Sequence, residues 1–484
     1  MNRHHPADRI RSRLHLVPLC ALTLVALLTA PASALGADEK LHEQMQRMQE
    51  RMENMARELE SLRAELAATQ ARLAERRSSA DGGEPGREPT AEPTPGDPRP
   101  ELSVDHGHLE VTSADGDFEV GIGGRLQLDA AFFDEDAGPI GNGFQVRRGR
   151  LYVAGRFDRD WHYKNQIDFA GNEASIKDAF IRYTGLPARL TLGHFKEPFS
   201  LEELMSARFI TFMERALPNV FAPARNLGLA ADFGGAIGDK GDGNGGWSAS
   251  LGAFGEGIDD ADFDGDAQRE DDEGVAVTGR LTAAPIATAD RLAHFGAAAS
   301  YRDTGDDTTL RLRQRFESRI ADRRLLDTGA IDGVDGLTRV GAEAAFAWGP
   351  LSLQGEYMHA ALRRPGRPDP AFSGYYVYGS WFLTGESRAS AYSTGSGKFG
   401  RLPPRSPLGR GPGGWELAAR FSRLDLTDAG IAGGEEDNVT VALNWYPVYN
   451  VRVGAEYVHV LDVTGGPNDG DEPAAFQMRA QVDF

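Results

Sequence analysis

The sequence ends with the stretch Phe476-Gln477-Met478-Arg479-Ala480-Gln481-Val482-Asp483-Phe484, which decides the fold. Every second residue from Phe476 to Phe484 is apolar, and the residues between them are polar. This period of two predicts a β-strand with one apolar face and one polar face. Because the hydrocarbon layer of a membrane tolerates no open sheet edge, such a strand must also pair along its edge. We therefore expect a membrane strand that closes a barrel by pairing with the first strand.

The same alternation runs through the sequence from about residue 107 onward, in segments as long as a tilted membrane strand. Sixteen candidate strands can be placed, at residues 118–133, 144–157, 162–170, 176–184, 189–195, 227–233, 247–254, 274–282, 293–302, 338–348, 350–360, 372–384, 413–424, 437–447, 450–462 and 474–484. An even number suits a single-chain barrel with both ends on the periplasmic side. The sequence therefore predicts an all-β, 16-stranded antiparallel transmembrane barrel, whose lumen is too wide for side chains to fill.

Alternation alone also fits a soluble β-sandwich, but three features favour the membrane. Trp381, Trp415 and Trp445 lie near segment ends, as the aromatic girdles of membrane barrels do. Some connections are very short, such as Gly349-Pro350, whereas others extend over tens of residues. Finally, the terminal alternation ending at Phe484 is similar to the signal by which outer-membrane barrels are recognised for assembly.

The N-terminal region predicts export. Hydrophobic residues make up 40% of the sequence, and the mean hydropathy of -0.41 excludes a helical membrane bundle. The long apolar run from Leu14 to Ala30 follows several arginines and precedes Ala32-Ser33-Ala34, an A-x-A cleavage pattern. We interpret residues 1–34 as a signal peptide; a single-span anchor is the alternative, but Pro18 interrupts the run.

A heptad pattern follows this segment. From Leu41 to Leu73, apolar residues recur at alternating steps of four and three, which predicts a self-associating coiled coil over residues 39–77. An amphipathic helix packed on a globular core would have a wider apolar stripe. Residues 78–106 are rich in Pro, Gly and Glu, and we expect an extended linker that separates the coiled coil from a barrel at residues 107–484.

Charge and motif content exclude several functions. The net charge of -20 argues against a nucleic-acid partner. The sequence contains no G-x-S-x-G, H-E-x-x-H or P-loop motif, and its only cysteine, Cys20, lies in the predicted signal peptide, so we expect no enzyme, metal site or cofactor. The acidic stretch at residues 255–274 begins like a calcium loop, but we interpret it as a solvated outer loop that gathers divalent ions bridged to lipopolysaccharide.

Arginines repeat at a spacing of two, at Arg148 and Arg150 and again at Arg311, Arg313 and Arg315. On an extended chain this spacing places each set on one face, so they are candidates for a positive ladder along a pore wall. The guanidinium fork suits phosphate oxygens, and rings of Arg or Lys select anions in pores. The alternative is that these arginines are ordinary solvated residues that pair with nearby aspartates.

The segment at residues 196–226, after the fifth predicted strand, is unusually apolar for a surface loop, with Phe199, Phe209, Phe212 and Phe221 among its residues. We expect it to fold inward against the barrel wall and to carry its polar residues into the lumen. An outward loop packed on a neighbouring subunit is the alternative interpretation.

Short motifs in this order and spacing resemble the phosphate-selective porin O and P family over nearly all of residues 107–484. They are Gly123-Gly124-Arg125-Leu126-Gln127, Arg147-Arg148, Asp160-Trp161, Tyr183-Thr184-Gly185, Glu214-Arg215, Tyr301-Arg302-Asp303, Leu383-Thr384-Gly385-Glu386, Trp415-Glu416-Leu417 and Asn444-Trp445-Tyr446. The resemblance implies a trimeric, 16-stranded barrel in which arginines lead anions to a narrow site made partly by the third loop. The positions that match pore-lining arginines are Arg125, Arg147, Arg148, Arg215, Arg311, Arg313, Arg315 and Arg319.

Two positions depart from the family pattern. Glu203 stands in the inward loop where the phosphate-selective type has a central lysine, and His162 replaces another lysine. A carboxylate at the narrowest point would oppose phosphate, with Lys177, Arg182 and Arg208 as candidates to compensate. The sequence therefore predicts an outer-membrane porin for small anions, with phosphate as the candidate. The alternative is a structural tether in which the coiled coil binds the cell wall or a periplasmic partner.

Overall fold

The structure, a computed structural model, describes residues 100–171, 173–237, 245–257, 274–305 and 308–484. The predicted signal peptide, coiled coil, most of the linker and most of the acidic stretch lie outside these residues. Within the described residues, no helix combines the length and apolar character needed to cross a membrane.

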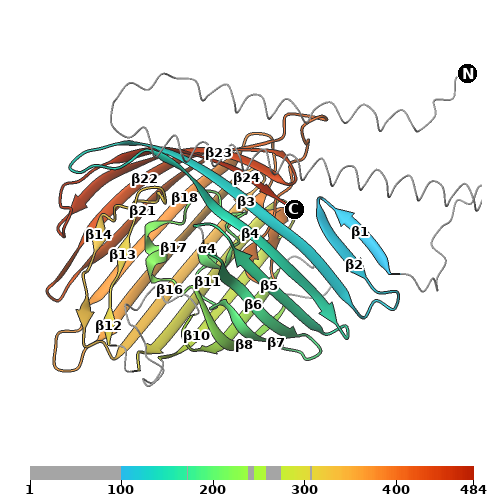
Figure 1. The fold of residues 1–484 in the computed structure, drawn as a ribbon, viewed down its shortest axis with the longest axis horizontal. Helices are drawn as coiled ribbons and strands as arrows, with labels where there is room; N and C mark the ends of the chain where they lie inside the picture. The colour runs from blue at the N-terminus through green and yellow to red at the C-terminus, as the bar shows by residue number, and fades with distance from the viewer. Residues whose placement is uncertain (1–99, 172, 238–244, 258–273, 306–307) are drawn as a thin grey trace, which may run out of the picture. The chain divides into compact units, whose positions relative to one another are not determined.

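Sixteen strands form the barrel, each antiparallel to its neighbours (Figure 1). They are β3 (Glu119–Asp134), β4 (Gly143–Phe157), β5 (Trp161–Asp168), β6 (Ser175–Tyr183), β7 (Arg189–Lys196), β8 (Arg225–Ala236), β9 (Gly246–Phe254), β10 (Val275–Ala287), β11 (Arg291–Asp303), β16 (Gly336–Trp348), β17 (Leu351–Arg363), β18 (Ala371–Phe382), β21 (Gly414–Asp428), β22 (Ile431–Val448), β23 (Val451–Thr464) and β24 (Ala474–Asp483). Every predicted segment overlaps one of these strands, so the predicted number and order of strands are confirmed.

The last strand closes the barrel, as its sequence predicts. β24 pairs with β3 in a register that runs from Ala474 opposite Asp134 to Asp483 opposite Arg125. Phe484 then exchanges two backbone hydrogen bonds with Gly124, at 2.8 and 3.1 Å. We call the end of the barrel that carries Phe484 the periplasmic rim, because the chain ends of outer-membrane barrels lie on that side.

The two faces of β24 show how the sequence sets the direction of each side chain. Phe476, Met478, Val482 and Phe484 point outward and are 39–43% exposed. The polar residues between them point into the barrel and are at most 5% exposed. An apolar outer face meets lipid, while the polar groups inside find hydrogen-bond partners in the lumen.

Two further strands precede the barrel. β1 (Glu101–Asp105) and β2 (His108–Thr112) form a hairpin, and β2 pairs with the beginning of β3. The predicted linker extended to residue 106, but its last residues form a strand because Leu102 and Val104 alternate with polar residues opposite β2.

Three connections occupy the interior. The inner loop, residues 197–224, contains α4 (Leu201–Leu204) and the short 3-10 helix η1 (Leu217–Phe221). The arginine-rich loop, residues 304–335, contains β12 (Thr309–Leu310), β13 (Arg313–Gln314), β14 (Leu326–Asp327) and β15 (Ile331–Asp332). The periplasmic insert, residues 383–413, contains η2 (Arg388–Ala391), β19 (Tyr392–Ser393) and β20 (Lys398–Phe399).

These connections pack on the inner surface of the wall. Phe199 and Phe221 of the inner loop join Leu310 and Phe316 of the arginine-rich loop in one buried cluster, which also contains inward-facing residues of β11, β16–β18, β21, β23 and β24. A second cluster packs Phe399 of the periplasmic insert against the inner loop and against inward-facing alanines. Apolar side chains therefore fill much of the lumen beside β11–β24.

The arginine-rich loop corrects the predicted ladder. Arg311, Arg313 and Arg315 do not share the face of a wall strand; they lie in a loop whose only strands here are two residues long. The alternating residues Leu310 and Leu312 are buried in the cluster of the lumen, so the period of two in this segment comes from packing inside the barrel.

Candidate functional site

The candidate site is a cavity of about 540 Å³ in the lumen, on the side formed by β3–β10. Two aspartates, Asp178 and Asp232, are the only acidic residues in its lining. Twelve basic residues line it: Arg125, Arg148, Arg150, Lys164, Arg182, Arg189, Lys196, Arg208, Arg215, Arg225, Arg280 and Lys398. The cavity is therefore strongly positive, although the whole chain carries a net charge of -20.

Strand geometry explains why so many arginines face inward. Residues of one parity on each strand point into the barrel, and a β-bulge on β4 adds one more. Gln127 pairs with Arg148 whereas Leu128 pairs with Val146, so Arg147 is the extra residue of the bulge. As a result the adjacent Arg147 and Arg148 both reach Glu214 of the inner loop, at 2.7 and 3.8 Å.

Four of the twelve cations have no carboxylate within ion-pairing distance among the described residues: Arg125, Arg182, Arg189 and Lys398. Arg125 donates to the neutral groups Ser206 Oγ and Gln166 Oε1, at 3.1 and 3.3 Å. Arg182 donates to Thr191 Oγ1 at 2.9 Å, and Arg189 donates to a backbone carbonyl. These partners satisfy hydrogen bonds but leave the positive charges uncompensated, which is the condition for attracting a mobile anion.

The periplasmic insert brings Lys398 into the cavity. Arg189 donates to the carbonyl of Gly395 at 2.8 Å, and Arg280 donates to that of Gly397 at 2.7 Å, so the tip of the insert is tied to β7 and β10. Burial and the nearby charges of Arg182 and Arg280 lower the pKa of Lys398 to about 8. Burial is the larger cause of this fall in pKa, and the two neighbouring arginines add to it.

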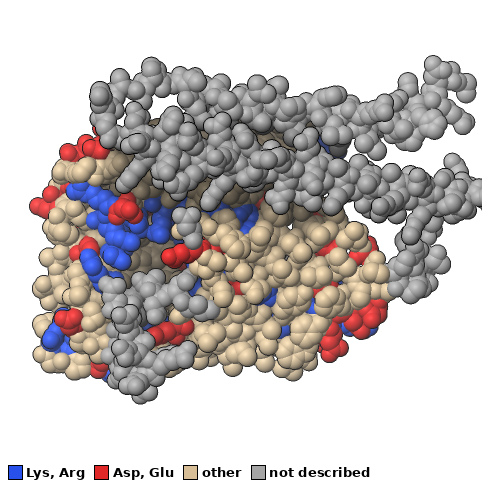
Figure 2. All heavy atoms as spheres, viewed as in Figure 1, with Lys and Arg blue, Asp and Glu red and all other residues tan. Residues whose placement is uncertain are grey.

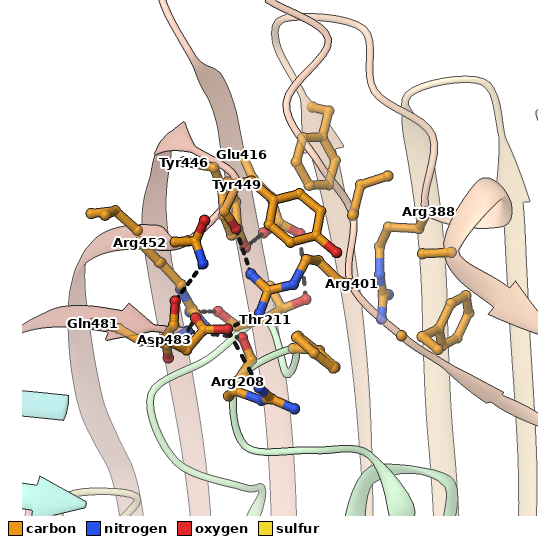
Figure 3. Close-up of a pocket in the computed structure, with 18 residues that line it drawn as sticks. Arg208, Thr211, Arg388, Arg401, Glu416, Tyr446, Tyr449, Arg452, Gln481 and Asp483 are labelled. Carbon is orange, nitrogen blue, oxygen red and sulfur yellow. Dashed lines mark hydrogen bonds and ion pairs between the residues drawn. The ribbon is translucent and has the colours of Figure 1, made fainter. Parts of the chain in front are cut away.

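A narrower pocket lies between the insert and the periplasmic rim (Figure 3). Arg401 of the insert forms an ion pair with Asp483, the residue before the C-terminal Phe484. Its guanidinium also lies over the ring of Tyr449, 4.5 Å from the centroid, and 5.1 Å from that of Phe209. Arg208 of the inner loop approaches the same Asp483 at 3.5 Å. The last strand thus holds both the inner loop and the periplasmic insert.

Glu203 does not point into the cavity as a free carboxylate. It lies in the first turn of α4, which Ser200 caps by accepting a hydrogen bond from the Glu203 N–H at 3.1 Å. Its carboxylate pairs with Lys196 at 2.9 Å and with Arg215 at 3.1 Å. Burial opposes its ionisation, but the two cations outweigh burial and lower the pKa of Glu203 to about 2. The sequence predicts that Glu203 repels an anion in the lumen, whereas in the structure its carboxylate orients two cations.

Substituting Glu203→Gln should strengthen anion preference and weaken the inner loop. The amide keeps the shape but leaves Lys196 and Arg215 uncompensated, and breaking a buried ion pair costs about 3–5 kcal/mol. We expect a larger chloride-over-potassium permeability ratio together with a lower melting temperature, measured in planar bilayers and by heat-dependent gel mobility. Glu472→Gln, at an exposed position of an outer loop, is the matched control.

The pH dependence checks the same ion pairs. The folded pKa of Glu203 lies below its ordinary value of 4.5, so its stabilisation is present above about pH 4.5 and is lost as the pH falls toward about 2. The Gln variant should lack this part of the acid dependence. A Gln variant with weaker anion preference than the native protein would contradict the proposed ion pairs. So would a variant whose stability falls at acid pH in the same way as that of the native protein.

The structure brings together part of the predicted site. Arg125, Arg148, Arg208 and Arg215 line the cavity. Arg147 lies beside it, bound to Glu214. The predicted residues outside the cavity lining are Arg147, Glu203, Lys177, Arg311, Arg313, Arg315 and Arg319. His162 and Arg182 are opposite one another on β5 and β6, and only Arg182 lines the cavity.

The arginines of the arginine-rich loop form a second basic group. Arg313 and Arg319 are exposed and make no side-chain hydrogen bond or ion pair with the residues that the structure describes. Burial, with the nearby charges of Arg315, Arg313 and Arg319, lowers the pKa of Arg324 to about 10. Arg311 instead pairs with Asp327 at 2.6 Å. Figure 2 shows Lys and Arg atoms gathered in a hollow near the strands labelled β13 and β14 in Figure 1.

Six basic residues that line the cavity are not among the site residues predicted from the sequence: Lys164, Arg189, Lys196, Arg225, Arg280 and Lys398. A signal existed for Lys398: residues 383–413 follow the twelfth strand, at the rim where other described turns have two to five residues. So long a connection on that side has to pack somewhere, and here it packs in the lumen. The strand residues give no comparable signal. The alternation shows which side chains point into the barrel, but not which part of the wall borders the open cavity.

Solved structures with a similar barrel include the anion-selective porin from Comamonas acidovorans, at 12% identity and a TM-score of 0.48, covering 75% of this chain and 99% of that one. The OmpT loop L8 deletion mutant of Vibrio cholerae aligns at 11% identity and a TM-score of 0.48, over 76% of this chain and 100% of that one.

Sequence comparison is more informative. An uncharacterized protein of Caulobacter vibrioides is 31% identical over 78% of this chain and 76% of its own length. Porin O of Pseudomonas aeruginosa is 28% identical over 78% of this chain and 91% of its own length. The family profile described as phosphate-selective porin O and P matches residues 120–484. The chain therefore belongs to the phosphate-selective porin O and P family, and this membership points to an outer-membrane porin.

Proposed function

We propose that this porin conducts small anions through the cation-lined cavity, with phosphate as the preferred candidate. The observation that carries the proposal is the composition of the lining, twelve basic against two acidic residues, with four cations that have no carboxylate partner in the described structure. Uncompensated charge in a narrow aqueous space raises the local concentration of counter-ions and excludes ions of like charge.

The three inward connections narrow the path in this proposal. The inner loop is fixed by hydrogen bonds from its backbone to lumen carboxylates: the Leu201 and Glu202 N–H groups donate to Glu356 at 2.9 and 2.7 Å, and the Met213 N–H donates to Glu456 at 3.0 Å. The buried cluster of the arginine-rich loop fills the opposite side of the lumen. An anion would pass the exposed arginines of that loop and then enter the cavity beside β3–β10.

The side chains in the cavity support an oxyanion as substrate. Arginine presents several N–H donors in a fixed plane, an arrangement that matches the oxygens of phosphate. Arg125, Arg182 and Arg189 donate only to neutral groups and so keep their full charge available to such a ligand. Because Glu203 is already paired with Lys196 and Arg215, it does not argue against phosphate.

Planar-bilayer recording tests the proposal. In a gradient of potassium chloride, the reversal potential should show chloride permeating in preference to potassium. Phosphate added to the same membrane should then reduce the chloride current at concentrations far below that of chloride. Selectivity for potassium would overturn the anion proposal, whereas chloride preference without phosphate block would leave a general anion pore.

A further inference from the structure

The cavity also has an apolar side, which the passage of a small inorganic anion does not require. Its lining includes four phenylalanines, Phe180, Phe195, Phe209 and Phe399, beside the twelve basic residues. Apolar rings that border a water-filled space bind no inorganic anion, and they forgo the free energy that full burial would give them. The lining therefore combines two chemistries, and a ligand that contacts both gains more than phosphate alone.

Phe180 of β6 brings the two chemistries together. Phe180 and Arg182 are two residues apart on the strand, so both side chains point into the barrel, where both line the cavity. The guanidinium carbon of Arg182 lies 5.1 Å from the centroid of the Phe180 ring. Arg182 donates to Thr191 Oγ1, directly opposite on β7, and has no carboxylate within ion-pairing distance among the described residues. A half-buried ring thus lies beside an uncompensated cation.

The ring of Phe180 is half-buried rather than enclosed. Phe195 meets it nearly edge-on, with centroids 6.2 Å apart and an angle of 72° between the two planes. Gly193 stands opposite Phe180 on β7, and a Cβ at that position would come within 3.1 Å of the Phe180 Cβ. The glycine therefore leaves space at this point of the wall, and a planar group in the cavity can pack against the ring.

The volume of the cavity suits a ligand larger than inorganic phosphate. It measures about 540 Å³, and pockets for organic ligands measure about 300–1,000 Å³. The share of one water molecule in the liquid is about 30 Å³, and the five heavy atoms of phosphate occupy only a few times that volume. Space for an organic substituent therefore remains beside a bound phosphate group.

Phe209 of the inner loop repeats the pairing of a ring with arginines. The centroid of its ring lies 5.0 Å from the guanidinium carbon of Arg208 and 5.1 Å from that of Arg401. Phe209 lines both the cavity and the narrower pocket beside the periplasmic rim (Figure 3). The same combination of chemistries therefore recurs where the path leads toward the periplasm.

We propose that the cavity binds phosphate monoesters that carry a planar apolar group, and that it holds them more tightly than inorganic phosphate. This inference rests on the proposed function and names a substrate class for the same cavity. The phosphate accepts hydrogen bonds from Arg182 and from Arg189, which lies two residues from Thr191 on β7. The planar group packs against Phe180, and the single ester oxygen of an aryl monoester is a link short enough for the 5.1 Å between Arg182 and that ring.

Block of the chloride current in planar bilayers tests the proposal. Phenyl phosphate is compared with methyl phosphate, which has the same charged group but no ring. The concentration that halves the current of the native full-length porin should be about tenfold lower for phenyl phosphate, because ring packing and apolar burial add to the same ionic contacts. Equal half-blocking concentrations of the two esters would overturn the proposal.

Variants of Phe180 show where the difference arises. Phe180→Leu keeps the apolar bulk but not the ring, so it should bring phenyl phosphate close to methyl phosphate and leave methyl phosphate unchanged. Phe180→Tyr keeps the ring and should retain the preference. Phe295→Leu, at a lipid-facing position of β11 that is 48% exposed, is the matched control. Heat-dependent gel mobility checks that each barrel is folded. A preference for phenyl phosphate that survives Phe180→Leu undiminished would contradict the role of this ring.

Inorganic phosphate, added in the same recordings, separates this inference from the proposed function. If inorganic, methyl and phenyl phosphate all block at the same low concentration, the phosphate channel stands and the inference fails. If none of the three blocks, the phosphate part of the proposed function fails together with the inference, while the reversal potential still decides between an anion pore and a cation pore.

Discussion

The double variant Arg182→Glu with Lys398→Glu should remove most of the anion preference of the pore. Both side chains line the cavity, and neither forms an ion pair with a described carboxylate. Their charges therefore act on the permeating ion rather than on a fixed partner. Each unit charge contributes about 1 kcal/mol at 4 Å even in bulk water, and about 1.4 kcal/mol corresponds to a tenfold ratio. Changing two positive charges into two negative ones should shift the chloride-to-potassium permeability ratio by at least about tenfold.

The control is Arg410→Glu together with Arg405→Glu, two exposed positions of the same periplasmic insert. This variant has the same change in net charge, but neither position lines the cavity. It should therefore shift the reversal potential only slightly. Heat-dependent gel mobility must first show that both barrels are folded. Equal shifts in the two variants would mean that net charge, and not the cavity, sets selectivity.

The pH dependence of the native pore provides a second check on Lys398. Its pKa of about 8 means that the ammonium loses its proton as the pH rises from about 7 to 9. Anion preference should fall over that interval in the native protein. The Lys398→Glu variant should lack this step, because its carboxylate stays ionised throughout.

Much of the barrel could be predicted because alternation is a local property of the chain. A strand with one face in lipid and one in the lumen has a period of two wherever it occurs, and all sixteen segments carry it. The alternation does not mark every strand boundary: β22 begins at Ile431, six residues before the predicted segment, because Gly433 and Gly434 interrupt the pattern. The pairing of β24 with β3 can also be predicted from the sequence, because a barrel in a membrane must close.

The site is harder to predict than the barrel. The period of two shows which side chains of a strand point inward, but not whether they contact water or pack against other protein segments. Arg311 and Arg313 alternate with Leu310 and Leu312, and either set could have faced water. The structure buries the leucines in a cluster built from distant strands, which no local pattern encodes. From the sequence alone Glu203 is expected to oppose anions, but its ion pairs with Lys196 and Arg215 depend on the tertiary structure.

The local sequence also does not specify which part of the barrel wall borders the open cavity. Inward positions of β11–β24 carry charged residues too, such as Arg420 and Arg479, but these are buried and paired with Glu317 and Asp129 at 2.5 and 2.7 Å. Arg182 and Arg189 have similar sequence surroundings, yet they face the cavity without a carboxylate partner. The inner loop, the arginine-rich loop and the periplasmic insert determine which inward-facing arginines are buried and which border the cavity. Their packing depends on contacts between residues that are far apart in the sequence.

Replacing residues 384–413 with a four-residue turn should raise single-channel conductance several-fold and weaken anion preference. The backbone allows the change, because Phe382 already pairs with Glu416 and the Leu383 N–H donates to the Trp415 carbonyl at 2.8 Å. A short Asn-Gly turn can therefore join β18 to β21 without altering the wall. The deletion removes Lys398 and the part of the insert that borders the cavity, so the path becomes wider and less positive.

Two point variants separate the causes of that change. Lys398→Ala removes one charge while the insert stays in place, so it should reduce anion preference with little gain in conductance. Arg401→Ala removes the ion pair with Asp483 and the contact with Tyr449, so the insert should loosen and the current should fluctuate between the native level and a larger one. If the turn replacement leaves conductance unchanged, the insert does not limit the flow. In that case the inner loop, held at Glu356 and Glu456, must form the narrowest point by itself, because it is the other connection that borders the cavity.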